Sequence, residues 1–184
     1  MKTIYRHFNE IRSILTSFDL FRDQFKCYKC GQSQFLVPHD IIYTPHKEPV
    51  GQRIFCSSRC RHQGCGATIR LYAQQVIPGK HHSTTKLSAF ITHLLNNETI
   101  ENAYRQATGT DDARQASRWL HKLHLNLSLF RVRLNMAPAS IGEHWRTSSR
   151  RLRLLLPTFR QLVDHFPRQD VCQSIQLLIQ KAVI

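Results

Sequence analysis

Two short cysteine motifs, Cys27-Tyr28-Lys29-Cys30-Gly31 and Gly64-Cys65-Gly66, bracket the stretch that decides the fold of this chain. Five of the six cysteines lie within this stretch. In a metal-binding turn, two thiolates converge on one ion, and the residue after them often takes a conformation that glycine adopts at little cost. The spacing therefore predicts two such turns, brought together by a hairpin around a metal ion with four cysteine ligands.

The fourth ligand is ambiguous because the second half of the stretch holds three cysteines. Cys60 is nearer to Cys65 in sequence and would give the more compact turn. Cys56 directly follows Ile54 and Phe55, which indicate the end of a strand, and a cysteine leaving a strand is well placed to bind metal. We favour a Zn²⁺ site whose ligands are Cys27, Cys30, Cys56 and Cys65. Cys60 is the competitor of Cys56 for the fourth place.

Other interpretations of the cysteines are less favoured. Disulfide bonds suit a small secreted domain, but no secretory signal peptide precedes these cysteines. A redox site of the thioredoxin type needs a βαβ surround and no second cysteine cluster. Histidines of the same region are alternative ligands, although a lone histidine in a polar loop is more often only solvated; these are His39, His46 and His62.

The charge of the chain indicates its partners. Lys and Arg number 26 against 12 Asp and Glu, which gives a formal net charge of +14. A balance of this sign favours nucleic acid as the first partner and an anionic membrane surface as the second. No apolar run approaches the ~20 residues of a membrane-spanning helix. Cysteines at metal spacing without a targeting segment predict a reducing, cytoplasmic location.

The first 77 residues are predicted to form a helix and a small β ribbon. Apolar residues recur every three to four positions over residues 1–25, which predicts an amphipathic helix with Ile4, Phe8, Ile11, Leu15 and Phe18 on one face. Residues 26–77 are predicted to form the zinc ribbon. Its strands are expected over 35–37, 40–43, 52–55 and 67–72, with a turn over 45–51.

After a linker that begins near Pro78, residues 84–124 predict three helices in a helix-turn-helix arrangement. Thr85, Asn97 and Asp111 are the expected caps of the three helices. The buried stripe of the third helix is expected to contain Ala113, Ala116, Trp119, Leu120 and Leu123.

The opposite face of the third helix is basic and polar. Arginine can bond guanine and glutamine can bond adenine in the major groove, whereas lysine suits phosphate. The predicted DNA-binding residues of this helix are Arg114, Gln115, Arg118 and Lys122. The alternative is an ordinary three-helix packing unit whose charged face is only solvated.

The C-terminal region, 125–184, predicts further helices over 125–136, 148–156, 159–166 and 171–183, with Pro157 breaking the chain between two of them. Three arginines at the start of the second are expected to contact phosphate: Arg150, Arg151 and Arg153. An apolar stripe on the last helix predicts association with a second copy or a partner protein; it contains Val171, Ile175, Leu178, Ile179 and Ala182. Cys172 is expected in a core or interface.

Several motifs, in their order along the chain, resemble those of a known group of DNA-binding regions. They are the CxxCG turn, Phe55-Cys56-Ser57-Ser58-Arg59, Gly64-Cys65-Gly66-Ala67-Thr68, the helix from Leu94 to Ala103, and Ser117-Arg118-Trp119-Leu120. Over roughly residues 27 to 124 the chain resembles the N-terminal DNA-binding region of insertion-sequence transposases and related small proteins. The resemblance implies a zinc ribbon followed by a helix-turn-helix that reads the terminal repeats of a mobile element.

The chain departs from that family in lacking a catalytic half. Cut-and-paste transposases carry an RNase H-like domain in which three carboxylates hold two metal ions. Beyond residue 124 the only acidic residues are Glu143, Asp164 and Asp170. The sequence also contains no GxxxxGK, GxSxG or HExxH motif. We therefore expect a binding protein, not an enzyme.

These observations predict an α+β protein, mostly α, with a small β zinc ribbon, a helix-turn-helix and a C-terminal helical region. The expected function is sequence-specific binding of double-stranded DNA by a zinc-containing accessory or regulator of a mobile element. One alternative is a zinc-ribbon protein that binds RNA or single strands, because Tyr28, Phe55 and Tyr72 could stack on unpaired bases. The other is the DNA-targeting subunit of a transposase whose catalytic chain is separate.

Overall fold

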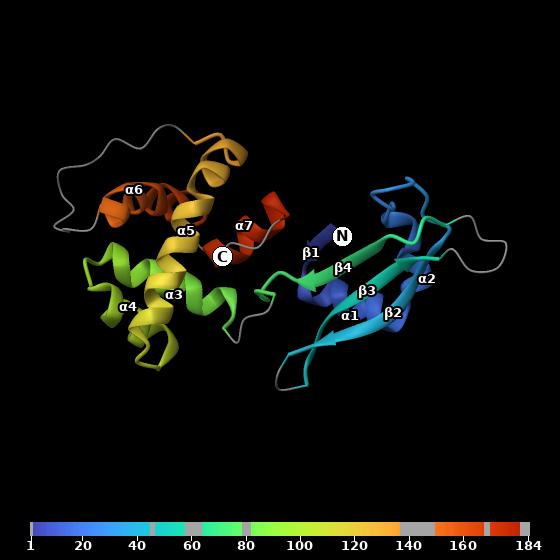
Figure 1. Ribbon diagram of the computed structural model, residues 1–184, viewed down its shortest axis with the longest axis horizontal. Helices are drawn as coiled ribbons and strands as arrows, with labels where there is room; N and C mark the ends of the chain where they lie inside the picture. Colours follow the sequence, from blue (N-terminus) through green and yellow to red (C-terminus); the bar gives the residue numbers. More distant parts are fainter. Residues whose placement is uncertain are drawn as a thin grey trace. The chain divides into compact units, whose positions relative to one another are not determined.

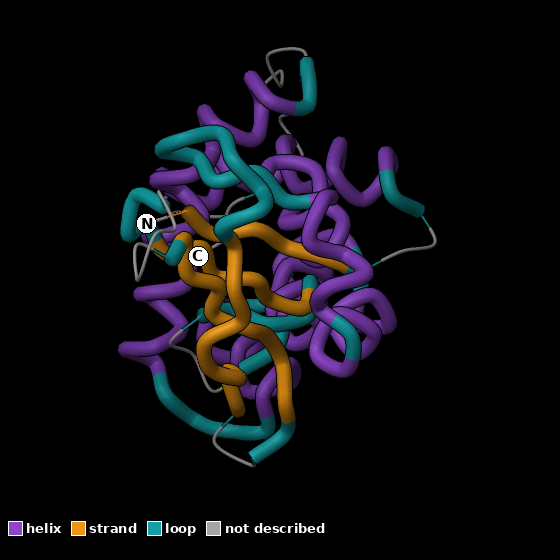
Figure 2. Tube along the Cα trace, turned by 90° about the vertical axis from the view of Figure 1, so that its right-hand side faces the viewer, coloured by secondary structure: helices purple, strands orange, loops and turns teal. Residues whose placement is uncertain are grey.

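The computed structural model describes residues 2–44, 47–57, 64–78, 82–136, 150–167 and 170–180. The fold is α+β, as predicted, and the chain divides into two compact units, unit 1 (Met1–Val76) and unit 2 (Ile77–Ile184). Every described strand belongs to unit 1, and unit 2 is built from helices (Figure 1; Figure 2). Among the described helices, none is long and apolar enough to cross a membrane.

Unit 1 is a mixed four-stranded sheet with helices on one face. Its strands lie in the order β1-β4-β3-β2; β1 runs parallel to β4, and the other neighbours are antiparallel. The elements in chain order are β1 (Lys2–Arg6), α1 (Phe8–Thr16), α2 (Phe18–Phe21), a 3₁₀ turn (Arg22–Gln24), β2 (Leu36–Tyr43), β3 (Pro49–Cys56) and β4 (Thr68–Ala73).

The prediction of one helix over residues 1–25 is wrong, because the first residues form a strand and the helical part is divided into α1, α2 and the 3₁₀ turn. Residues 2–6 form β1, and its pairing with β4 runs from Lys2 beside Ile69 to Arg6 beside Ala73. Tyr5 is buried and stacks on Tyr72, with ring centroids 6.2 Å apart. Pairing with β4 and stacking on Tyr72 override the helical periodicity of these residues. Because both partners are distant in sequence, the local pattern does not reveal them.

The core of unit 1 lies between the sheet and α1. Alternate residues of a strand point to opposite faces, and Ile54, Ile69 and Leu71 are fully buried where α1 packs across β3 and β4 (Figure 1). Ile11 and Ile14 supply the buried face of α1. The intervening positions, on the other face of the sheet, include two basic residues, Arg53 of β3 and Arg70 of β4, beside the aromatic residues Phe55 and Tyr72.

The predicted strands are confirmed, with one merger and one earlier start. The two short strands expected over 35–43 form the single strand β2, which has a register shift between Pro38 and Asp40. β3 begins at Pro49, so Gly51 is part of a strand and not of the expected turn. A Cβ on Gly51 would run into the Leu71 carbonyl of β4, which explains why glycine occupies this position.

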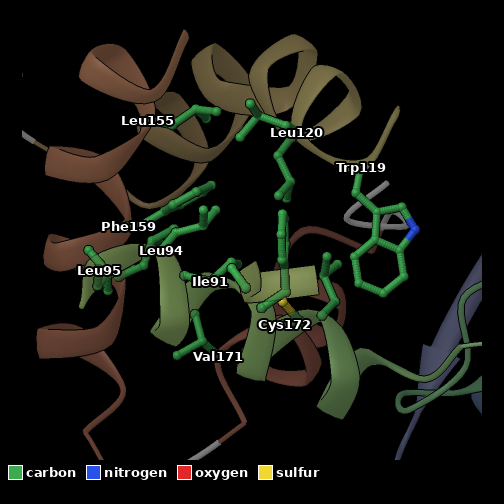
Figure 3. Close-up of a cluster of buried hydrophobic side chains, with 14 of the residues drawn as sticks. Ile91, Leu94, Leu95, Trp119, Leu120, Leu155, Phe159, Val171 and Cys172 are labelled. Atoms are coloured by element: carbon green, nitrogen blue, oxygen red, sulfur yellow. The ribbon is translucent and has the colours of Figure 1, made fainter. Parts of the chain in front are cut away.

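Unit 2 consists of helices around one apolar core. The helices are α3 (Thr84–Leu95), α4 (Ile100–Thr108), α5 (Ala113–Arg133), α6 (Arg150–His165) and α7 (Val171–Ile179). Figure 3 shows buried side chains meeting in one cluster, among them Ile91 of α3, Leu120 of α5, Phe159 of α6 and Cys172 of α7. α4 adds Ala103 and Tyr104 to the same core.

The three helices predicted between residues 84 and 124 are present, but their expected caps are wrong by one or two positions. In each helix a side-chain oxygen accepts a hydrogen bond from the backbone N–H three residues ahead, which satisfies one of the free donors at the helix start. The caps are Ser83 in place of Thr85, Thr99 in place of Asn97, and Asp112 in place of Asp111.

Two predicted helix breaks are absent. α5 continues through residues 124 and 125, so the helix expected from 125 is the second half of α5. α6 continues through Pro157, which lacks the N–H of a regular helix and costs roughly 3 kcal/mol in a helix interior. Burial of Leu155, Leu156 and Phe159 around the proline offsets this cost, at about 1.5–3 kcal/mol for each fully buried side chain.

The apolar stripe of α7 lies largely inside unit 2. Val171, Cys172 and Ile175 are buried where α7 packs against α3 and α5. Leu178, by contrast, is 59% exposed, and the predicted stripe residue Ala182 lies outside the described residues. The apolar face that predicted association with a partner is therefore used mainly by the chain itself.

Candidate metal centre and nucleic-acid interface

The first cysteine pair lies in a tight turn before β2. The Cys27 backbone N–H donates to the Gln32 carbonyl at 3.1 Å, and the Gly31 N–H donates to the Cys27 carbonyl at 2.8 Å. Gly31 has φ +75°, a left-handed conformation that glycine adopts without the steric cost of a Cβ. The turn brings Cys27 and Cys30 to one side of the loop.

The second cysteine pair is formed by the β3–β4 pairing. Cys56 is the last residue of β3, and its N–H donates to the Ala67 carbonyl at 2.8 Å. The Gly66 N–H donates back to the Cys56 carbonyl at 3.0 Å, and Gly66 has φ +71°. These two hydrogen bonds hold Cys65 beside Cys56, across the gap in sequence between them.

The four thiols form one cluster. Their Sγ atoms all lie within 4.8 Å of one another; Cys27 is 3.4 Å from Cys65, and Cys30 is 3.7 Å from Cys56. Four thiolates at about 2.3 Å from a tetrahedral ion would be about 3.8 Å apart. None of the four is in a disulfide, whose sulfurs would be about 2.05 Å apart. The cluster therefore fits one metal ion with four sulfur ligands.

The structure places Cys56, the favoured fourth ligand, in this cluster. Its competitor Cys60 lies outside the described residues, as do the alternative ligands His46 and His62. His39 is in β2, where its Nδ1 lies 3.0 Å from an Asp40 carboxylate oxygen, and it is not in the cluster. Cys56, which was favoured because it follows a predicted strand, is thus the last residue of β3 and a member of the cluster.

The thiols differ in how readily they ionise. Burial raises the pKa of Cys56 to about 12 and also raises that of Cys65. Burial acts in the same direction on Cys27, but backbone N–H groups of Cys30 and Lys29 donate to its sulfur and bring its pKa down to about 7. Cys27 therefore ionises to a thiolate more readily than Cys56 or Cys65 does.

The α5 helix carries the predicted DNA-binding face. Arg114 and Arg118 are exposed, and Gln115 and Lys122 are half-buried. Within the described residues, no ion pair engages either arginine, and α5 itself contains no Asp or Glu. The opposite side of α5 is buried as predicted at Ala116, Trp119, Leu120 and Leu123. Ala113 is the exception: it is exposed because it is the first residue of the helix.

Trp119 fixes α5 against the two preceding helices. Its indole lies edge-to-face against Tyr104 of α4 and Phe90 of α3, with ring centroids 5.0 Å and 5.6 Å away. Gly109 ends α4 with φ +75°, which turns the chain sharply toward α5. Such packing is worth about 0.5–1.5 kcal/mol for each aromatic pair beyond burial. The basic face of α5 is consequently held in a defined orientation within unit 2.

The arginines at the start of α6 are only partly described. Arg151 and Arg153 are exposed, on a helix whose other side packs against α5, and nothing is described of the Arg150 side chain. Arg151 and Arg153 are thus accessible to an anion from solvent.

One feature was not found from the sequence. A hollow of about 400 Å³, called here the basic hollow, lies beside the cysteine turns and is lined by Tyr28, Lys29, Arg53, Arg70 and residues 66–68. The signal available in the sequence was the presence of Arg53 and Arg70 at outward positions of two neighbouring predicted strands. Arg53 and Arg70 lie opposite each other only in the observed register of β3 and β4, and the sequence pattern does not specify this register.

Comparison with known proteins adds no relative to this description. No family model matches the chain, and neither the curated proteins nor the solved structures contain a significant match. The functional conclusions therefore depend on the chemistry of the chain's own residues.

Proposed function

We propose that this protein is a zinc-containing, sequence-specific DNA-binding protein that recognises duplex DNA and has no enzymatic activity. The observation that carries the proposal is the basic face of α5, which is free of described ion pairs and is anchored from behind by Trp119. A rigid helix with free guanidinium groups is what reading of the major groove requires.

The spacing of the polar residues on α5 supports base reading. Arg114 and Arg118 are four positions apart, so they lie on the same face of the helix, one turn from each other. An arginine can bond both acceptors of a guanine edge, and Gln115 can bond an adenine edge in the same way. We assign Lys122, with Arg151 and Arg153 of α6, to phosphate contacts, which add affinity but no sequence preference.

Zinc is the metal that we assign to the four-cysteine cluster. A tetrahedral set of four thiolates suits zinc or an iron–sulfur centre, and zinc is the usual ion of closed structural sites with four cysteines. By joining the turn before β2 to the end of β3 and the start of β4, the ion would contribute directly to the folding free energy of unit 1.

The association with a mobile element is supported by the resemblance of residues 27–124 to the DNA-binding region of insertion-sequence transposases. We propose that the protein acts as an accessory or regulatory DNA-binding factor of such an element.

The test compares Arg118→Ala with Arg133→Ala, which removes another exposed arginine, at the far end of the same helix. Affinities are measured for a selected duplex site and for random duplex at several salt concentrations. Loss of a base contact should cost about 1–3 kcal/mol on the selected site only. Arg133→Ala should leave the ratio of the two affinities unchanged. If Arg118→Ala weakens both duplexes equally, α5 does not read sequence.

A further inference from the structure

The basic hollow of unit 1 contains an arrangement that the fold itself does not require. Arg53 of β3 and Arg70 of β4 are direct cross-strand partners. Like charges at such positions destabilise a sheet, because the side chains lie only about 5 Å apart at their Cβ atoms. Arg53 is compensated by Asp40 of β2, with a nitrogen–oxygen distance of 3.3 Å.

Arg70 has no comparable partner. Within the described residues, neither a hydrogen bond nor an ion pair engages its guanidinium, and the Nε atoms of both arginines are buried without an acceptor. A buried donor without a partner costs about 1–3 kcal/mol. An anion in the basic hollow would accept hydrogen bonds from the terminal nitrogens of Arg70, which are not among the buried atoms, and would reduce the repulsion between the two guanidinium groups.

The wall formed by the first cysteine turn adds an aromatic ring and a further cation. Tyr28 is 46% exposed although its neighbour Cys27 is buried. Lys29 is exposed beside it. An exposed aromatic ring next to basic side chains is the combination by which proteins hold single strands, with a base stacked on the ring and the backbone phosphate on the cations.

The size of the basic hollow limits what it can hold. Its volume of about 400 Å³ is at the small end of ligand sites, which span about 300–1,000 Å³. That is space for a single nucleotide-sized group and not for a helix or a duplex groove. Stacking on Tyr28 also requires a base whose face is not covered by its neighbours, as in an unpaired strand.

We infer that the basic hollow binds an unpaired nucleotide of a single-stranded nucleic acid, with the phosphate held by Arg70 and Lys29 and the base stacked on Tyr28. This site is separate from the duplex-reading face of α5 and does not depend on it. A competing explanation is that the cations only compensate the negative charge of a metal ion bound by four thiolates.

The experiment measures the binding of a short oligothymidylate to the full chain with its metal, by fluorescence anisotropy, with two matched pairs of variants. Tyr28→Ala is compared with Tyr43→Ala, which removes an exposed tyrosine outside the hollow. Lys29→Gln is compared with Lys26→Gln, which removes an exposed lysine on the other side of Cys27. Metal content is measured for every variant.

We expect Tyr28→Ala and Lys29→Gln each to weaken oligothymidylate binding roughly fivefold or more, with metal content unchanged. The oligothymidylate affinities of Tyr43→Ala and Lys26→Gln should remain within about twofold of that of the parent protein, because neither residue lines the basic hollow. Equal affinities within both pairs would overturn the inference, as would equal losses for Lys29→Gln and Lys26→Gln, because the effect would then reflect net charge alone.

Four further arms sharpen the result. Arg70→Gln should weaken oligothymidylate binding with its metal retained; loss of metal with unchanged binding would instead support charge compensation. Oligouridylate in place of oligothymidylate distinguishes an RNA strand from a DNA strand as the source of the nucleotide. Random duplex should bind Tyr28→Ala normally, and equal losses on duplex and single strand would refute stacking. Arg118→Ala should keep its oligothymidylate affinity, so a failure of duplex reading would not be mistaken for a failure of this site.

Discussion

Replacement of Gly64 by alanine tests the candidate metal centre through its backbone. A Cβ on Gly64 would lie 2.5 Å from the carbonyl carbon of Ser57 and 3.1 Å from that of Cys56. Carbon atoms in favourable contact are about 3.5–4.0 Å apart, so the chain must move by about 1 Å. The next residue is Cys65, and metal–ligand distances tolerate only about 0.2 Å.

The displacement should cost one of the four sulfur ligands. Changes to outer partners of metal ligands already lower metal affinity about 10–100-fold, so we expect a loss of roughly 100-fold or more for Gly64→Ala. The matched control is Gly66→Ala, because the Cβ at Gly66 would meet nothing within 4 Å and only the φ of +71° is unfavourable. That strain costs about 1–2 kcal/mol.

The assay is competition for zinc between each variant and a chromophoric chelator, with circular dichroism to follow the fold of the chain. Equal zinc affinities of Gly64→Ala and Gly66→Ala would refute this prediction. The contact with Ser57 would then be relieved without moving Cys65.

Three further predictions concern the ligands, the pH dependence and the core. Cys56→Ser should abolish metal retention whereas Cys60→Ser should not, as measured by metal content after gel filtration; the reverse pattern would assign the fourth ligand to Cys60. Burial raises the pKa of Cys172 above its ordinary value, so the thiol stays neutral in the folded chain but ionises in the unfolded one. The free energy of unfolding should therefore fall as pH rises above about 9. Cys172→Ala should make this fall smaller, as measured by urea titrations at several pH values. Trp119→Ala should cost about 3–5 kcal/mol of stability in the same titrations, because the indole is fully buried between α3, α4 and α5, and a change under 1 kcal/mol would contradict its role as an anchor.

The features that the sequence predicted best are those fixed by local chemistry. A metal turn needs its two cysteines and its glycine at set positions, so Cys27, Cys30 and Gly31 could be assigned before any fold was known. The buried stripe of α5 was similarly predictable, because every fully buried residue from Ala116 to Leu123 recurs at helical spacing.

The features that were missed depend on contacts between distant residues. The strand β1 exists because β4 accepts it in parallel, and nothing near Ile4 indicates that partner. The helix α6 passes through Pro157 because its apolar face is buried on both sides of the proline. The pairing of Arg53 with Arg70 follows from the register of β3 and β4, which single-sequence patterns specify only loosely.

The two outer strands of the unit 1 sheet limit its growth by strand addition. An unprotected edge strand offers a row of backbone donors and acceptors on which other chains can pair and aggregate. β1 is short and has a cation at each end, Lys2 and Arg6. β2 contains Pro38, which has no N–H to offer to an incoming strand, and its ladder is shifted just after that residue. Both edges are thus poor templates, which favours a sheet that stays four strands wide even at high protein concentration.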